Sequence, residues 1–384
     1  TNGDGGSNVQ KLAEGESHDE VFSVTVRDGH GGETTQDITI TVHGTNDAPT
    51  AENNIGSVVE DTQIHTGDTD TAHADGNILA NDNDIDNNHT LTVSQVGRDS
   101  ANIGTAVNGV YGKVTINADG SYTYELNNDA GNVQALREGQ TVTDTFGVQI
   151  TDEHGATATE TLTITIIGTN DKPVISLTGT DHDSAALTET NASLTESGTL
   201  TLTDIDLNDT VGTVKVDTIT TGGTYGGTLP SDETLKQMLT LTNGSLDDSQ
   251  TTGKINWTFD SGAENFDFLA KDETLILTYT VKSTDDSGMA NDSDTHEITI
   301  TITGANDAPV VTAITGDVTE DADATPSTTD SLTASGNAIT DHTTDLDASD
   351  THTISAVNGE SAKVGQTING AYGSITVNAD GTYT

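Results

Sequence analysis

The sequence predicts an all-β chain of tandem antiparallel β-sandwiches, and three observations carry this prediction. Many short segments alternate apolar and polar residues with a period of two, which is the pattern of a strand with one buried face. These segments are separated by turns rich in Asp and Gly, and Gly alone supplies 40 of the 384 residues. One Trp, seven Tyr and five Phe are too few aromatic side chains for one large core. We therefore expect several small sandwiches.

Three similar strings divide the chain into repeats. They read GTNDAPT from Gly44, GTNDKPV from Gly168 and GANDAPV from Gly304, and they are 124 and 136 residues apart. Both spacings are typical of a single domain. We predict two complete modules flanked by the back of one module and the front of another, at residues 46–169, 170–305, 1–45 and 306–384, respectively. Both ends are expected to be cut from a longer array.

Each string follows a predicted hairpin. Its second strand is an alternating run at 38–42, 162–166 or 298–302, and its first strand is a similar run at 22–26, 146–150 or 277–281. A second type of hairpin is predicted at 114–124 and 375–383, where an Asp-Gly pair supplies the residues with positive φ. Strands at this short spacing, with almost no helical periodicity, predict an immunoglobulin-like sandwich.

The charge of the chain excludes one class of function and suggests a type of cofactor. With 12 basic and 62 acidic residues the net charge is −50, which excludes a nucleic-acid binder. Asp supplies 44 of the acids, so the loops carry most of the charge. There is no Cys to form disulfides or bind zinc, so an oxygen-liganded metal is the natural cross-link. No apolar run approaches the length of a membrane span, and the first residues do not read as a secretion leader.

An Asp-aliphatic-Asp pair recurs after each junction string. In an extended segment, residues two apart point the same way, so we expect both carboxylates to face one point and the intervening Ile or Leu to pack inward. Calcium prefers six to eight oxygen ligands, so a pair needs help from neighbouring loops. In such a sandwich the linker, this loop and the turn of the last hairpin lie at one end. The predicted calcium ligands are Asn46, Asp47, Asp84, Asp86 and Asp152, then Asn170, Asp171, Asp204, Asp206 and Asp285, then Asn306, Asp307, Asp345 and Asp347.

Acids before each penultimate strand should lie at the base of the preceding module, so that each cage bridges two modules. These are Glu14 and Glu16, Glu138, and Asp272 with Glu273. Two Val-x-Glu-Asp strings add further candidate ligands, at Glu60 with Asp61 and at Glu320 with Asp321.

The junctions, the Val-x-Glu-Asp strings and the Asn-Ala-Asp-Gly-x-Tyr-Thr hairpins resemble bacterial VCBS repeats, which occur in tandem in large RTX-type adhesins. The junctions are also similar to cadherin linkers, whose calcium sites combine linker residues with an Asp-x-Asp pair of the next domain. Gly44, Gly168 and Gly304 stand where the cadherin linker has an Asp, which removes one ligand. The glycine-rich RTX nonapeptides are absent. The resemblance implies a calcium-rigidified extender of a bacterial surface adhesin, secreted by a type I system, that projects a distal binding domain for surface or biofilm attachment.

The acids and the insertion also allow other interpretations. Paired carboxylates also hydrolyse glycosides, but an enzyme does not need one pair in three modules, and no catalytic motif is present. A module that grips carbohydrate or a partner protein, or adhesion between module faces, stays an alternative. Near 221–250 an insertion contains residues 230–239, which read as a short capped helix; we expect a decorative insertion, the alternative being a ligand site. Trp257 should be core, and His30 and His154 exposed turn residues.

Overall fold

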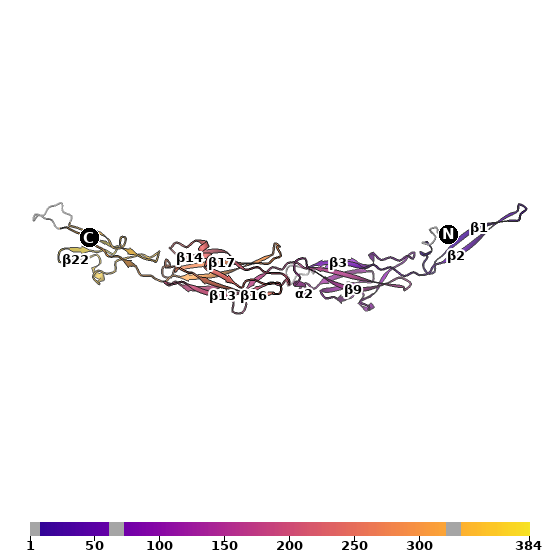
Figure 1. The fold of residues 1–384 in the computed structure, drawn as a ribbon, viewed down its shortest axis with the longest axis horizontal. Helices are drawn as coiled ribbons and strands as arrows, with labels where there is room; N and C mark the ends of the chain where they lie inside the picture. The colour runs from indigo at the N-terminus through magenta and orange to yellow at the C-terminus, as the bar shows by residue number, and fades with distance from the viewer. Residues whose placement is uncertain (1–7, 61–72, 320–331) are drawn as a thin grey trace.

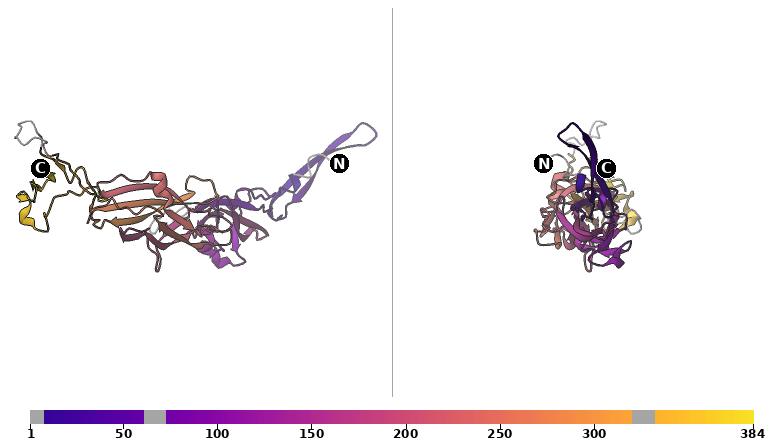
Figure 2. Two further views of the ribbon diagram at one scale, coloured as in Figure 1. Left: turned by 60° about the vertical axis from the view of Figure 1, so that its left-hand side comes forward. Right: turned by 90° about the vertical axis from the view of Figure 1, so that its right-hand side faces the viewer.

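The computed structural model describes residues 8–60, 73–319 and 332–384. An N-terminal hairpin, two β-sandwiches and a set of short C-terminal strands follow one another along a rod, with the termini at opposite ends (Figures 1 and 2). The prediction of an all-β chain is confirmed. The helices that lie wholly within the described residues are single turns or little more: α2 (Gly131–Gln134), α3 (Asp232–Gln237), η1 (Ile78–Ala80), η2 (Ser100–Asn102) and η3 (Ser361–Lys363).

The first sandwich pairs two four-stranded sheets with the orders β3-β10-β9-β5 and β4-β8-β7-β6. Its strands are β3 (Asn54–Val59), β4 (His73–Asn77), β5 (Thr92–Val96), β6 (Ala106–Asn108), β7 (Gly112–Ile116), β8 (Ser121–Leu126), β9 (Thr141–Thr151) and β10 (Thr157–Ile167). The two predicted hairpins are confirmed as β7–β8 and β9–β10. Strand β3 runs parallel to β10, whereas the other neighbours are antiparallel. The first strand is thereby held along residues 162–167, the second half of the last strand.

The second sandwich repeats this plan, with sheets ordered β12-β18-β17-β14 and β11-β13-β16-β15. Its strands are β11 (Val174–Ser176), β12 (Ser184–Thr188), β13 (Thr195–Thr203), β14 (Lys215–Thr224), β15 (Leu239–Thr242), β16 (Thr252–Asp260), β17 (Thr274–Thr284) and β18 (Ser293–Thr303). The parallel pair recurs as β12 and β18, and β17–β18 is the predicted last hairpin.

Each sandwich has its own core, formed by the inward-facing residues of the alternating strands. In the first sandwich Tyr124, Ile150 and Ile164 are fully buried, and in the second Trp257 and Tyr279 are. Full burial of one large aliphatic side chain contributes roughly 1.5–3 kcal/mol, so these strands are fixed by packing as well as by their ladders. The prediction that Trp257 belongs to the core is confirmed.

The two ends of the described chain are simpler. The N-terminal hairpin consists of β1 (Ser17–Arg27) and β2 (Glu33–His43), paired antiparallel along their whole length. Its apolar side chains are exposed, whereas the equivalent residues of β9–β10 are buried. The C-terminal segment contains β19 (Val310–Val311), β20 (Gly336–Asn337), β21 (Thr343–Thr344), β22 (Thr367–Asn369), β23 (Ser374–Thr376) and β24 (Thr382–Tyr383).

The insertion of the second sandwich contains the predicted helix, α3. Ser231 is its N-cap, because its side-chain oxygen accepts a hydrogen bond from the amide of Thr234 at 3.3 Å. Leu235 is fully buried and fixes the helix on the core. Among the residues that the structure describes, no helix is long and apolar enough to cross a membrane.

Candidate metal centres

The second junction, around Asn170 and Asp171, gathers its five predicted residues. The Asn170 side-chain amide donates to Asp285 Oδ2 at 3.2 Å. The Asp171 backbone amide donates to Asp206 Oδ2 at 2.9 Å, and the Asp206 amide donates to Asp204 Oδ1 at 3.1 Å. The linker, the loop before β14 and the turn between β17 and β18 therefore meet at one end of the second sandwich. Asp209 joins them, because its carboxylate lies within 4.8 Å of ligand atoms of Asp204 and Asp285.

The first sandwich contributes acids to the same junction. Glu60 follows β3, and the parallel pairing with β10 brings it to the linker, where its Oε2 accepts the Thr169 amide at 3.3 Å. Its Oε1 accepts the side-chain amide of Gln134 at 3.1 Å. Glu138 Oε2 accepts the Asn170 amide at 3.3 Å. Carboxylates from both sandwiches thus face the same linker.

Several buried oxygens at this junction accept no hydrogen bond among the described residues. They are Oε1 of Gln134, Oδ1 of Asn170, Oδ2 of Asp204 and Oδ1 of Asp206. Buried oxygens without a partner are rare in native proteins and call for an unseen ion or water. All four are hard oxygen donors, the ligand type that calcium prefers. The donor set therefore fits a calcium ion. An open groove of about 1100 Å³, lined in part by Asp171 and Asp204, gives access from solvent.

The electrostatics of the second junction point the same way. Burial raises the pKa of Glu60 to about 8, helped by repulsion from Asp171 and Asp206. Burial, with repulsion from neighbouring carboxylates, raises the pKa of Asp204 and that of Asp206 to about 7. Without a cation these groups therefore hold protons near neutral pH, since the fully ionised cluster is too costly. A bound divalent cation removes that cost.

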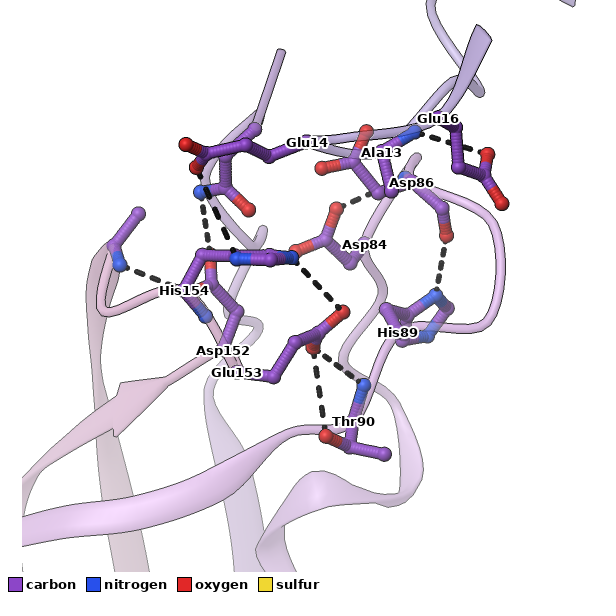
Figure 3. A network of polar contacts seen from close by, with 12 residues as sticks. Ala13, Glu14, Glu16, Asp84, Asp86, His89, Thr90, Asp152, Glu153 and His154 are labelled. Atoms are coloured by element: carbon purple, nitrogen blue, oxygen red, sulfur yellow. Dashed lines mark hydrogen bonds and ion pairs between the residues drawn. The ribbon is translucent and has the colours of Figure 1, made fainter. Parts of the chain in front are cut away.

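The first junction, around Asn46 and Asp47, repeats the arrangement (Figure 3). The Asn46 side-chain amide donates to Asp152 Oδ2 at 3.0 Å, and the Asp47 amide donates to Asp86 Oδ2 at 2.9 Å. Asp84 Oδ2 and Asp86 Oδ1 are buried and accept no hydrogen bond among the described residues. Although burial opposes it, hydrogen bonds from Asn46 and the turn amides lower the pKa of Asp152.

Acids from the N-terminal side also face the first junction. Figure 3 shows Glu14 and Glu16 above the Asp84–Asp86 loop. Glu16 Oε2 accepts the side-chain amide of Asn87 at 3.4 Å, and Glu14 lies 3.8 Å from His154. His154 and His30 are exposed turn residues, as predicted.

The third junction, around Asn306 and Asp307, keeps the centre of this pattern. The Asp307 amide donates to Asp347 Oδ2 at 2.9 Å, and the Asp347 amide to Asp345 Oδ1 at 3.1 Å. Asp307 Oδ2 and Asp347 Oδ1 are buried without a partner among the described residues. Asn306 is not drawn in, because its side-chain amide donates to its neighbour's carbonyl. His352 lowers the pKa of Asp345, whose Oδ2 it contacts at 2.7 Å.

Two further acids complete the third junction. Glu189 Oε2 accepts the Ala305 amide at 2.8 Å, as Glu60 does with Thr169 at the second junction. Ligand atoms of Glu189, Asp267 and Asp307 lie within 4.8 Å of one another. Glu273 is already engaged, since its carboxylate accepts the Ser349 hydroxyl at 2.6 Å and the Ala270 amide at 3.0 Å.

A backbone contact also recurs at every junction. The amides of Asn87, Leu207 and Ala348, each directly after its Asp-x-Asp pair, donate to the carbonyls of Lys11, Ala135 and Phe268 in turn, at 2.9–3.2 Å. The linker glycines make a separate close approach, to the base of the unit that ends at each linker. A Cβ built on Gly44, Gly168 or Gly304 would overlap a carbonyl oxygen of the preceding unit. The cadherin-type Asp is therefore excluded here by the close approach of two backbones.

One expectation about the Asp-x-Asp loops is wrong. The intervening aliphatic residues do not pack inward: Ile85, Ile205 and Leu346 are 43%, 37% and 56% exposed. The loop is a bend and not an extended strand, since each second Asp donates its amide to the first Asp's carboxylate. The two carboxylates take the inward side of this bend, which leaves the residue between them outside.

Sequence reasoning missed four residues of these clusters, which are Gln134, Glu189, Asp209 and Asp267. Glu189 does not stand in a Val-x-Glu-Asp string, so that motif does not find it. Gln134 and Asp267 occupy equivalent positions at the second and third junctions, but because their side chains differ no repeated motif marks them. Asp209 is replaced by His89 at the first junction. Asp61, Glu320 and Asp321 lie outside the described residues.

One segment of the chain matches a known domain family. Residues 46–168 match the family of bacterial cadherin-like domains. Similar solved structures include protocadherin gamma B2 extracellular cadherin domains 3–6 (13% identity, TM-score 0.35, 76% of this chain and 59% of that one). The extracellular domain of protocadherin gamma B4 is another (16% identity, TM-score 0.39, 78% of this chain and 39% of that one). A third is mouse protocadherin-24 EC1-3 (16% identity, TM-score 0.29, 75% of this chain and 80% of that one). This chain thus spans just over half of the first. No curated protein matches it. The chain therefore contains a segment that resembles the bacterial cadherin-like domain, within an all-β array that repeats the same elements.

Proposed function

We propose that this chain is a calcium-rigidified extender of a secreted bacterial cell-surface adhesin, built from VCBS-type repeats of an RTX-type protein. It would hold a distal binding domain away from the cell for surface or biofilm attachment. The observation that carries the proposal is the set of buried carboxylate oxygens without hydrogen-bond partners, which recurs among the described residues at all three junctions. The rod-like succession of units in Figure 1 suits a spacer.

The proposal assigns modules to residues 46–169 and 170–305, with partial modules at 1–45 and 306–384. The proposed ligands are those predicted from the sequence, Glu60 among them, apart from Asn306 and Glu273, whose side chains are engaged in other hydrogen bonds. Glu189, Asp209 and Asp267 are added from the structure. The first junction has His89 in place of Asp209, and the second has Gln134 in place of Asp267. The number of ions should therefore differ along the rod. The proposed partners are calcium and the neighbouring modules, and the proposed location is the cell surface after type I secretion.

The mechanism is electrostatic. Two like charges 4 Å apart repel by about 4 kcal/mol at the effective dielectric near a protein surface. Each junction holds several carboxylates donated by two consecutive units, so without metal the units push apart or retain protons. Calcium turns that repulsion into attraction between the units. In a calcium-poor cytoplasm the junctions stay loose, and outside the cell they stiffen.

Small-angle scattering with and without calcium tests this proposal. The parent chain should have a longer maximum dimension in calcium than in EGTA. The double variant Asp204→Asn with Asp206→Asn should shorten in calcium, because the second junction becomes a hinge. A matched control changes two exposed acids of the same sandwich, Asp217→Asn with Asp247→Asn, and should keep the parent's dimension. No calcium binding by titration calorimetry, or equal dimensions for the parent in both conditions, would refute the proposal.

A further inference from the structure

The insertion of the second sandwich reaches the third junction through one loop. After β14 the chain passes Tyr225, Gly226 and Gly227 before it enters α3. The Tyr225 ring packs edge-on against Phe268, with 6.4 Å between ring centroids and an interplanar angle of 67°. The backbone of Gly227 lies directly on the same ring, since a Cβ there would overlap the Phe268 side chain. The loop is therefore seated on Phe268.

The same loop touches the unit that follows. A Cβ built on Gly226 would lie 3.0 Å from Cβ of Ser349 and 3.5 Å from its backbone nitrogen. Ser349 belongs to the loop of the third Asp-x-Asp pair, and its hydroxyl donates to Glu273 at 2.6 Å. The preceding residue, Ala348, donates its amide to the Phe268 carbonyl at 3.2 Å. Ser349 therefore lies between the insertion loop and the base of the second sandwich.

Phe268 is a firm base for this contact. Its ring packs against Phe266 with 6.2 Å between centroids, and Phe266 is fully buried in the second core. At the first and second junctions the equivalent position, identified by the backbone hydrogen bond from the next unit, holds Lys11 and Ala135. Neither can form an aromatic seat. The contact is thus particular to the third of the described junctions.

We propose that the Tyr225–Gly227 loop is a clasp that holds the third junction without metal. Its aromatic pair and its backbone packing against Phe268 fix the loop within the second sandwich, and its van der Waals contact with Ser349 crosses the junction. None of them involves a carboxylate, so none requires charge neutralisation. The third junction should keep its alignment in calcium-poor conditions, where the second junction loosens. The insertion, expected from the sequence to be decorative, acquires a role as a contact between units.

Spin-label distance measurements on the full chain test the clasp, because the chain has no Cys that would be labelled by accident. One label at Thr258→Cys is paired with Asn369→Cys across the third junction or with Thr143→Cys across the second; all three positions are exposed. In EGTA, the parent's distance distribution should stay narrow across the third junction and broaden across the second.

Two variants with one matched control complete the test. Gly226→Val places a branched side chain against Ser349, and Tyr225→Ala removes the ring; each should lose the narrow distribution across the third junction in EGTA. The control is Gly222→Val, since a Cβ at Gly222 meets no atom within 4 Å. It should leave the distribution narrow. Circular dichroism confirms that each variant is folded.

Two results would overturn the clasp. One is a distance distribution across the parent's third junction that is as broad in EGTA as the distribution across its second junction. The other is a distribution across the third junction of Gly226→Val that stays as narrow in EGTA as that of Gly222→Val. Both comparisons are made without calcium, so they do not depend on the proposed metal sites. If calcium fails to narrow the second junction, the proposed function fails while the clasp is still judged on its own measurements.

Discussion

Replacing Asp204 by Asn should change the stability of the second sandwich with opposite signs in chelator and in calcium. Asp204 is 4% exposed, and its ligand atom lies within 4.8 Å of those of Asp209 and Asp285. In chelator the negative charge of Asp204 is destabilising, because it is buried beside other carboxylates. In calcium the same carboxylate serves as a ligand of the proposed ion. Asn keeps the size and one carbonyl oxygen but removes the charge.

The expected gain in chelator follows from the raised pKa. Burial and neighbouring acids raise the pKa of Asp204 from 3.8 to about 7. The folded state therefore holds the proton longer than the unfolded state, and the free energy of unfolding in EGTA falls as pH rises from about 4 to about 7. At 1.36 kcal/mol per pKa unit the full cost of ionisation is about 4 kcal/mol. Since the neighbouring acids share protons, we expect Asn to recover about 2 kcal/mol of it at about pH 8.

The expected loss in calcium follows from binding linkage. At millimolar calcium and a dissociation constant near 10⁻⁵ M, one site stabilises the folded chain by about 2.7 kcal/mol. Loss of the Asp204 carboxylate should remove most of this contribution from its site. The variant is then less stable than the parent in calcium, although it is more stable in EGTA.

Denaturant unfolding followed by tryptophan fluorescence measures both effects. Trp257 is the only Trp and is fully buried in the second sandwich, so the signal reports this unit alone. Asp217→Asn is the control, because it makes the same charge change at an exposed site. It should move the midpoint little in either condition. A shift of the Asp204→Asn midpoint in the same direction in EGTA and in calcium would refute the reasoning.

Two further predictions concern the first sandwich and its linker. Burial and the nearby Asp82 raise the pKa of Glu160 to about 7, so the free energy of unfolding of the parent's first sandwich should fall as pH rises from about 4.5 to about 7. Glu160→Gln should flatten this profile in calorimetry and add about 2 kcal/mol at about pH 8, and an unchanged slope would contradict it. Gly168→Ala should destabilise the packing of the linker on the base of the first sandwich by roughly 1–3 kcal/mol, because the new methyl group overlaps the carbonyl of Leu136 in the same unit. The control is Gly147→Ala, because a Cβ at Gly147 meets no atom within 4 Å. In limited proteolysis the linker after Gly168 should be cleaved faster in Gly168→Ala than in the control, and equal cleavage of this linker in the two variants would count against the close approach.

The strands were predictable because their signal is local. A period of two over five residues places β9, β10, β17 and β18 without knowledge of their partners, since each strand needs one buried face. The Asp-Gly pair at Asp119 likewise predicts the β7–β8 turn, because positive φ at Gly120 is a property of the turn itself. Recurrence then brings the acids together, since three loops that follow the junction Asn residues by 34 to 39 residues are expected to serve the same end of each sandwich.

The remaining parts of the site depend on contacts between distant segments. Glu189 reaches the linker because β12 pairs in parallel with β18, and no local pattern gives the register of Leu187 on Ile302. The outward position of Ile205 is set by the hydrogen bond from the Asp206 amide to Asp204, which overrides the alternation of an extended chain. The first depends on the register of two distant strands, and the second on a side-chain hydrogen bond that the alternation of apolar and polar residues does not reveal.

The junctions therefore combine two kinds of contact that respond to different conditions. The backbone hydrogen bond onto Lys11, Ala135 or Phe268 joins two consecutive units, and the linker glycines let each linker pack closely on the base of the unit that it leaves. The acids around it oppose the approach until a cation is bound. A junction whose close approach rests only on one hydrogen bond is thus sensitive to calcium. Where Phe268 seats the loop whose Gly226 meets Ser349 of the next unit, packing across the junction adds an attraction that does not depend on charge. The residue at the position of Lys11, Ala135 or Phe268 can in this way set how strongly each junction responds to calcium.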